Sequence, residues 1–146
     1  MTPATGRARG ERGAAATEFA LLVPSLILIA GLLVGGGRVW FARATVAQLA
    51  QSAARGASVA RDAHTATATA RAAARLQAES SGLRCEPLEV RTDAAGFAIP
   101  VGRPASVTVT VDCLVPLGDV LVPGWPGSLP LTASAESVLD RYRERR

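Results

Sequence analysis

Few residues in this sequence have the types and spacing that chemistry needs. The single histidine, His64, has no nucleophile near it along the chain, and a solvated polar residue is its simplest interpretation. One histidine and two cysteines cannot supply the ligand spacing of a metal site. No GxSxG, HExxH, Walker or GxGxxG pattern occurs in a usable context. The sequence therefore predicts a protein that is not an enzyme, with no catalytic residues, metal ligands or cofactor.

Glu18 is the one chemically unusual position, because it is a lone acid at the start of an uncharged run from Phe19 to Gly37. A carboxylate in lipid is costly and tends to be functional, and an apolar run of about 18 residues or more can span a membrane. We expect a transmembrane helix over residues 14–41 after a disordered leader over residues 1–13. The leader's arginines favour a cytoplasmic N-terminus. The cysteines and strands further along favour an extracytoplasmic C-terminal part.

Two features within the predicted span concern helix geometry and packing. Pro24 cannot donate a hydrogen bond to the carbonyl of Ala20, so we expect a bend or a locally re-satisfied turn. Gly31 and Gly35 form a GxxxG pair on roughly the same stripe, which lets helix backbones approach closely in lipid. The general abundance of glycine in membrane helices explains the pair equally well. An interfacial anchor is expected just after the apolar run, at Arg38, Trp40, Phe41 and Arg43.

Residues 42–82 are rich in alanine and predict a helical region. Small residues recur there every seven positions, as in a face that packs against another helix. This small-residue seam consists of Val39, Val46, Ala53 and Ala60. We expect it to extend the span into one long packing surface, while residues 13–37 serve as both anchor and assembly interface. A second helix is expected over residues 66–79, ended by Ser80, Ser81 and Gly82.

Residues 83–146 change to a period of two. Valines alternate with Ser, Thr and Asp over residues 105–115, which predicts a half-buried strand. Shorter strands are expected over residues 88–91 and 129–135, and turns rich in glycine and proline separate the three. The predicted fold class is α+β: a long N-terminal transmembrane helix continues into a helical stalk, and a small three-stranded antiparallel sheet follows.

Cys85 and Cys113 both lie beyond the span, where an oxidising compartment would join them in a disulfide. If they stood directly opposite in a regular ladder, Glu89 and Arg91 would face the valine side. We therefore expect Cys85 in the loop before its strand, with Pro87 interrupting the ladder. The alternative is a pair of buried free thiols.

The formal charge of +4 does not indicate nucleic-acid binding. All sixteen basic residues are arginines, and they are scattered along the chain with few aromatic residues between them. A nucleic-acid binder would gather them on one face. No nucleic-acid partner is expected.

Several stretches share the pattern of one family. They are Arg12-Gly13, the small run 14–16, Glu18-Phe19, Pro24, AARGASVA at 53–60, the strand at 107–115 and SLPLTASA at 128–135. The N-terminal part resembles the class III signal peptides of type IV pilins. More closely, the chain resembles TadE-like proteins of the tight-adherence (Flp pilus) system.

This resemblance implies a membrane-anchored minor pilin or pseudopilin that helps to assemble a surface pilus. Its partners would be the membrane, other pilin or pseudopilin subunits, the pilus assembly machinery and a prepilin peptidase. The peptidase would cut between Gly13 and Ala14 on the cytoplasmic side, which leaves a single-pass protein in the cell membrane. Glu18 would become the fifth residue and pair with the new α-amino group of a neighbouring subunit. Alternatively, Glu18 only caps the first turn at the positive helix terminus.

Two other interpretations remain open. Ala42-Arg43-Ala44 is a small-x-small site, so a Sec-exported protein cut after Ala44 would release a soluble domain. The apolar run is longer than the usual signal sequence, which argues against this. The second interpretation is a single-pass anchored binding module unrelated to pili.

Overall fold

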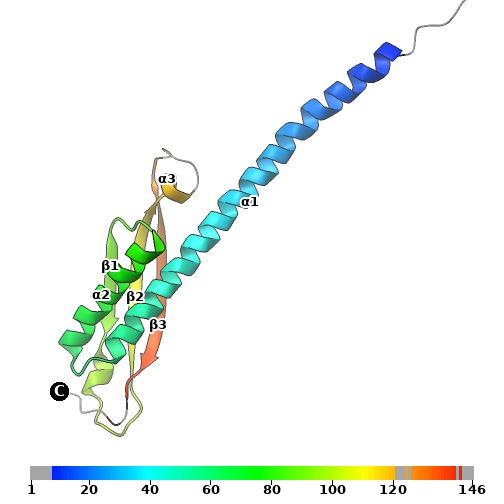
Figure 1. The fold of residues 1–146 in the computed structure, drawn as a ribbon. Coiled ribbons are helices and arrows are strands. Elements are labelled where there is room, and N and C mark those ends of the chain that lie inside the picture. Colours follow the sequence, from blue (N-terminus) through cyan, green and yellow to red (C-terminus); the bar gives the residue numbers. More distant parts are fainter. Residues whose placement is uncertain (1–7, 121–123, 125, 141, 143–146) are drawn as a thin grey trace, which may run out of the picture. The chain divides into compact units, whose positions relative to one another are not determined.

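The computed structural model describes residues 8–120, 124, 126–140 and 142, and for residues 8–17 it describes the backbone alone. The chain divides into two units, Met1–Gly37 and Arg38–Arg146. Helix α1 (Ala8–Ser58) begins in the first unit, and helix α2 and a three-stranded sheet follow in the second (Figure 1). The predicted α+β class is confirmed.

Helix α1 contains the whole apolar run and continues through Pro24. Beside this proline, the hydroxyl of Ser25 donates hydrogen bonds to the carbonyls of Leu21 (3.2 Å) and Leu22 (2.8 Å). A side-chain hydroxyl can thus bond backbone carbonyls in the turn where proline has no N–H to donate.

The start of α1 differs from the prediction. The helix begins at Ala8, within the stretch expected to be a leader, while residues 1–7 lie outside the described residues. Residues 8–12 include alanine, arginine and glutamate, which are good helix formers. Gly10 and Gly13 each weaken a helix by about 1 kcal/mol relative to alanine, but glycine does not block helix propagation as proline does.

Helix α2 (Ala63–Ser81) has a start and an end that its sequence specifies. Asp62 accepts a hydrogen bond from the backbone N–H of Thr65 at 2.8 Å, which satisfies a donor that the first turn leaves open. Gly82 ends the helix in the left-handed conformation (φ 69°), which glycine adopts without a steric penalty. The buried residues of α2 are alanines spaced four positions apart, which form one stripe along the helix: Ala66, Ala70, Ala74 and Ala78.

The partner of the small-residue seam lies within the same chain. Val46 and Ala53 are buried in the core, and a Cβ added to Gly56 would lie 3.2 Å from the Cβ of Ala73 in α2. The prediction that this face packs against another helix is therefore confirmed, and that helix is α2 of the same chain. Heptad spacing shows that a helix face is buried, but not which surface buries it.

The sheet is antiparallel, in the order β1 (Leu88–Asp93), β2 (Ser106–Pro116) and β3 (Ser128–Val138). The three predicted strands are confirmed: β1 and β3 are longer than expected, and β2 is shifted by one residue from the expected range 105–115. Val111 of β2 faces Val90 of β1 and Ala133 of β3 in the register. This face of the sheet is therefore mainly apolar, as the alternation predicted, although Thr92 opposite Val109 and Ser137 opposite Val107 also lie on it.

The core of the second unit lies between this apolar face and the two helices. The fully buried strand residues are Val107, Val109, Val111 and Val115, with Cys113 1% exposed. They form one cluster with the buried alanines of α2 and with Val46 and Leu49 of α1. Small helix residues and β-branched strand residues allow both helices to lie close to the sheet.

Candidate membrane segment and assembly site

The apolar part of α1 is uncovered on every side. Its large side chains from Phe19 to Val34 have exposed fractions between 47% (Val23) and 79% (Leu21). Consecutive residues point about 100° apart around a helix, so Leu21, Leu22 and Val23 together expose most of its circumference. An 18-residue window has a mean hydropathy of 2.4 with no residue buried, and the helix is long and apolar enough to cross a membrane. A surface that is apolar all round is typical of a helix surrounded by lipid or by other helices.

Glu18 is exposed at the start of this apolar segment. It lies four residues after Ala14 in the continuous helix α1, so the two positions share one face, one turn apart. The Gly13–Ala14 peptide bond itself lies inside α1. The structure therefore brings the predicted processing site and the predicted assembly acid onto adjacent turns of one helix.

The first glycine of the GxxxG pair, Gly31, has no close neighbour in the described part of the chain. A Cβ added to Gly31 would meet nothing within 4 Å, and Gly35 is only partly buried. Gly56 of the second unit, in contrast, faces α2 closely enough that an added Cβ would be crowded. Any packing role for Gly31 therefore requires a second molecule.

Aromatic and basic residues follow the apolar segment directly. Trp40 is 72% exposed and Phe41 is 65% exposed, and Arg38 and Arg43 beside them are exposed too. Exposed tryptophan next to arginine is typical of the level where a membrane helix enters the headgroups. These four residues have the exposure that an interfacial anchor needs.

The predicted disulfide is present. Cys85 and Cys113 are joined with a Cα–Cα distance of 5.0 Å. Cys85 lies in the loop before β1, whose first residue, Leu88, is the ladder partner of Cys113. The expectation that Cys85 precedes the ladder is confirmed, and the alternative of two free thiols is wrong. The bridge ties the α2–β1 loop to the central strand.

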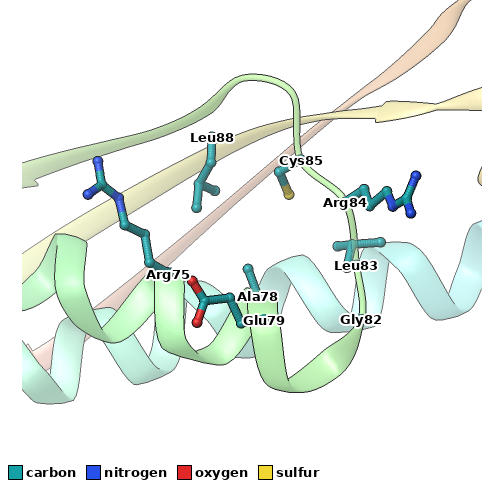
Figure 2. A pocket seen from close by; sticks show the side chains of 8 residues that line it. All are labelled: Arg75, Ala78, Glu79, Gly82, Leu83, Arg84, Cys85 and Leu88. Carbon is teal, nitrogen blue, oxygen red and sulfur yellow. The ribbon is translucent and has the colours of Figure 1, made fainter.

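A cavity of about 710 Å³ opens beside this bridge (Figure 2). Its apolar lining includes Leu83 and Leu88, while Arg75 and Glu79 of α2 supply charged side chains. Among the described residues, no three His, Cys, Asp or Glu side chains gather as they would to hold a metal ion. His64 is exposed on α2 and does not line this cavity.

The outer face of the sheet carries a polar network that sequence reasoning did not identify. Asp112 accepts a hydrogen bond from Thr132 at 2.7 Å and pairs with Arg91 at 2.5 Å. Thr110 and Ser134 are hydrogen bonded at 3.0 Å. The alternation indicated which residues face outward, but the pairs depend on the strand register. Cross-strand pairs of this kind stabilise the sheet and leave its outer face polar.

Sequence reasoning also missed a second cavity, of about 540 Å³, which begins at Arg38. It brings Arg38 and Phe41 of α1 together with Leu83 and Arg84 of the α2–β1 loop. The arginines are 46 positions apart in the chain. The sequence held only a weak signal for this cavity, namely the position of Arg38 directly after the apolar run.

Comparison with known proteins identifies one family. Residues 13–55 match the family described as TadE-like protein, which confirms the predicted resemblance over this segment. The match includes the Gly13–Ala14 bond, Glu18 and the whole apolar run, and it ends inside the part of α1 that packs on α2. No curated protein and no solved structure matches the chain.

Proposed function

Because residues 13–55 form a TadE-like segment, we propose that the chain is a membrane-anchored minor pilin or pseudopilin-like protein that takes part in assembling a tight-adherence (Flp-type) pilus. The observation that carries this proposal is the uncovered apolar part of α1, which begins at Glu18 and lies within the matched residues. The role is structural rather than catalytic. The expected partners are other pilin or pseudopilin subunits, the pilus assembly machinery and a prepilin peptidase.

In this proposal the peptidase cuts between Gly13 and Ala14. The bond lies within α1, so the first turns must unwind before it can enter a protease. Gly10 and Gly13 favour that step, because each makes the helix less stable by about 1 kcal/mol relative to alanine. Cleavage leaves Glu18 as the fifth residue, near the positive end of the shortened helix.

Glu18 then has a specific task in assembly. Its carboxylate pairs with the α-amino group of Ala14 in a neighbouring subunit, which matches two charges that would each be costly in lipid. Gly31 and Gly35 allow the helices of adjacent subunits to approach. The simpler role, in which Glu18 only stabilises its own helix terminus, requires no neighbour and predicts normal assembly without the acid.

The proposed topology has a cytoplasmic N-terminus and an extracytoplasmic C-terminal unit. The disulfide supports this orientation, since such bridges persist in oxidising compartments. The Sec alternative is less well supported, because a cut after Ala44 would fall inside α1 and remove Ala42 from the core of the second unit. An unrelated anchored module would lack pilus ATPase, peptidase and platform genes nearby in the genome.

Intact mass measurement on protein purified from membranes tests the processing step. We expect a chain that begins at Ala14 and lacks the mass of residues 1–13. Gly13→Leu should retain the leader, whereas Gly10→Leu, a matched change within the leader, should still be cut. An N-terminus at Met1 or Thr2 in the wild-type protein would refute cleavage, and a soluble product beginning at Thr45 would favour Sec export.

Assembly is tested separately by the amount of mature chain that copurifies with pilus fractions. If Glu18 pairs in lipid, Glu18→Gln should be processed normally yet enter the fraction at least about 100-fold less, since removing one partner of a buried pair costs about 3–5 kcal/mol. Gly31→Leu should also reduce incorporation, while Gly36→Leu, outside the GxxxG pair, should not. Normal incorporation of Glu18→Gln would support the helix-terminus role instead.

A further inference from the structure

A groove at the beginning of the second unit has the lining of a site for an anionic headgroup. Its volume is about 540 Å³. Arg38, Phe41, Ala42 and Thr45 form one wall, and their spacing of i, i+3, i+4 and i+7 places them on one face of α1. The opposite wall comes from the α2–β1 loop and α3 (Leu117–Val120).

The charges in this groove favour an anion. Arg38 and Arg84 line it, against the single acid Asp119. Arg91 pairs with Asp112 on the sheet, and among the described residues no salt bridge joins Arg38 or Arg84 to an acid. Both arginines are exposed, and a guanidinium presents several donors in a geometry that fits phosphate oxygens. Apolar atoms of Phe41, Leu83 and Val115 lie beside these charges.

The distance along the helix places this groove at the level of lipid headgroups. Arg38 follows Gly37, the last residue of the apolar run, and Phe41 lies only about 5 Å further along the helix axis. The headgroup layer on each side of a bilayer is roughly 5–8 Å thick. In the proposed topology, the phosphates nearest to the groove are therefore those of the membrane in which α1 is anchored.

We propose that the groove between Arg38 and Arg84 binds the phosphate of an anionic phospholipid, with Phe41 and Leu83 against the glycerol and upper acyl chain. This inference rests on the proposed membrane anchoring of α1. It gives Arg84 a role at the membrane that its position in the sequence does not suggest, because the α2–β1 loop begins 45 residues after Gly37. The disulfide at the adjacent Cys85 ties this loop to β2. The bound lipid would hold the second unit in one orientation against the bilayer.

The test uses the full chain reconstituted in vesicles of phosphatidylcholine that contain phosphatidylglycerol as the minor lipid. Native mass spectrometry after release into mild detergent measures the ratio of the two lipids retained by the protein. The lipid retained by the wild-type protein should contain a higher fraction of phosphatidylglycerol than the vesicles do. Each of the two replacements in R38Q/R84Q should lower this enrichment about fivefold. Asp119→Asn should raise it, a gain that misfolding would not produce.

The matched control is R55Q/R61Q, which removes the same charge from two exposed arginines outside the groove. It should retain phosphatidylglycerol as the wild-type protein does. Equal enrichment in R38Q/R84Q and wild type, or an equal loss in both double variants, would overturn the proposal. Resistance to alkaline carbonate extraction reports anchoring independently. A wild-type chain that is extracted overturns the anchor and the groove together, whereas inserted protein with unchanged lipid ratios overturns the groove alone.

Discussion

Removal of the Cys85–Cys113 bridge should lower the stability of the second unit by about 3–4 kcal/mol. The two cysteines are 28 positions apart. In the chain-entropy model, closing a loop of this length lowers the entropy of the unfolded chain, which stabilises the folded state by this free energy. The closed loop contains all of β1, the connection to β2 and most of β2, so its freedom in the unfolded state is large. For a unit of about 110 residues, this corresponds to a melting temperature about 15 °C lower.

Cys85→Ala is the informative variant. It breaks the bridge at a partly buried loop position and leaves Cys113, which is 1% exposed, in the core. The double variant C85A/C113A should be less stable by roughly a further 1 kcal/mol, because the buried sulfur atom also contributes packing. The difference between the two variants separates the effect of the bridge from the effect of core packing.

Differential scanning calorimetry of the full chain in mild detergent measures these differences. Reductant should shift the wild-type protein to the melting temperature of Cys85→Ala and leave the variant itself unchanged. If Cys85→Ala melts within about 2 °C of the wild-type protein, the loop-entropy reasoning is refuted. Two free thiols in the native protein, found by mass mapping without reduction, would refute the bridge itself.

Two further predictions concern the second unit. Gly96→Ala in the 3-10 helix Ala95–Ala98 should destabilise the second unit by about 1–3 kcal/mol, because the added Cβ would overlap with the backbone carbonyl oxygen of Ser106. Gly36→Ala is the control and should leave the unfolding transition of this unit unchanged, since nothing lies within 4 Å of the added Cβ. Equal stability of both variants would contradict the predicted overlap. The pKa of Asp62 is held below its usual value of 3.8, first by the hydrogen bond from the backbone N–H of Thr65 and then by that from its hydroxyl. The resulting stabilisation is complete above the usual pKa and is lost as pH falls through the lower folded pKa. The melting temperature of Asp62→Ala should therefore lie below that of wild type at neutral pH, and the difference between the two should shrink in acid. Asp62→Asn is the control, because its amide oxygen still accepts a hydrogen bond but does not titrate. A difference in melting temperature that is independent of pH would show that the ionised carboxylate contributes nothing.

The alternation of valines was sufficient to predict the central strand and its inward face. A strand that alternates apolar and polar residues buries its apolar face, so Val107 and Val109 were expected in the core once the strand formed. The loop position of Cys85 followed from the same alternation, because direct opposition to Cys113 would have turned Glu89 inward. These predictions depend on local geometry, and local geometry is set by neighbouring residues.

The small-residue seam shows where this reasoning stops. Its spacing showed correctly that one face of α1 packs against another helix, but it did not identify that helix. In the structure, α2 and the sheet cover it, with Gly56 against Ala73. Packing partners depend on how distant elements meet, and one helix face is compatible with several partners of similar shape.

The sequence by itself determined the apolar run, the acid at Glu18, the strands and the cysteine pair, because hydropathy, charge and side-chain period are properties of adjacent residues. Only the tertiary structure decided which surfaces remain free. It covered the seam, left the apolar part of α1 exposed, joined Asp112 to partners on two strands and brought Arg84 to Arg38. Each of these outcomes depends on the register of the sheet or on the closure of the chain over tens of residues, and no local pattern specifies either.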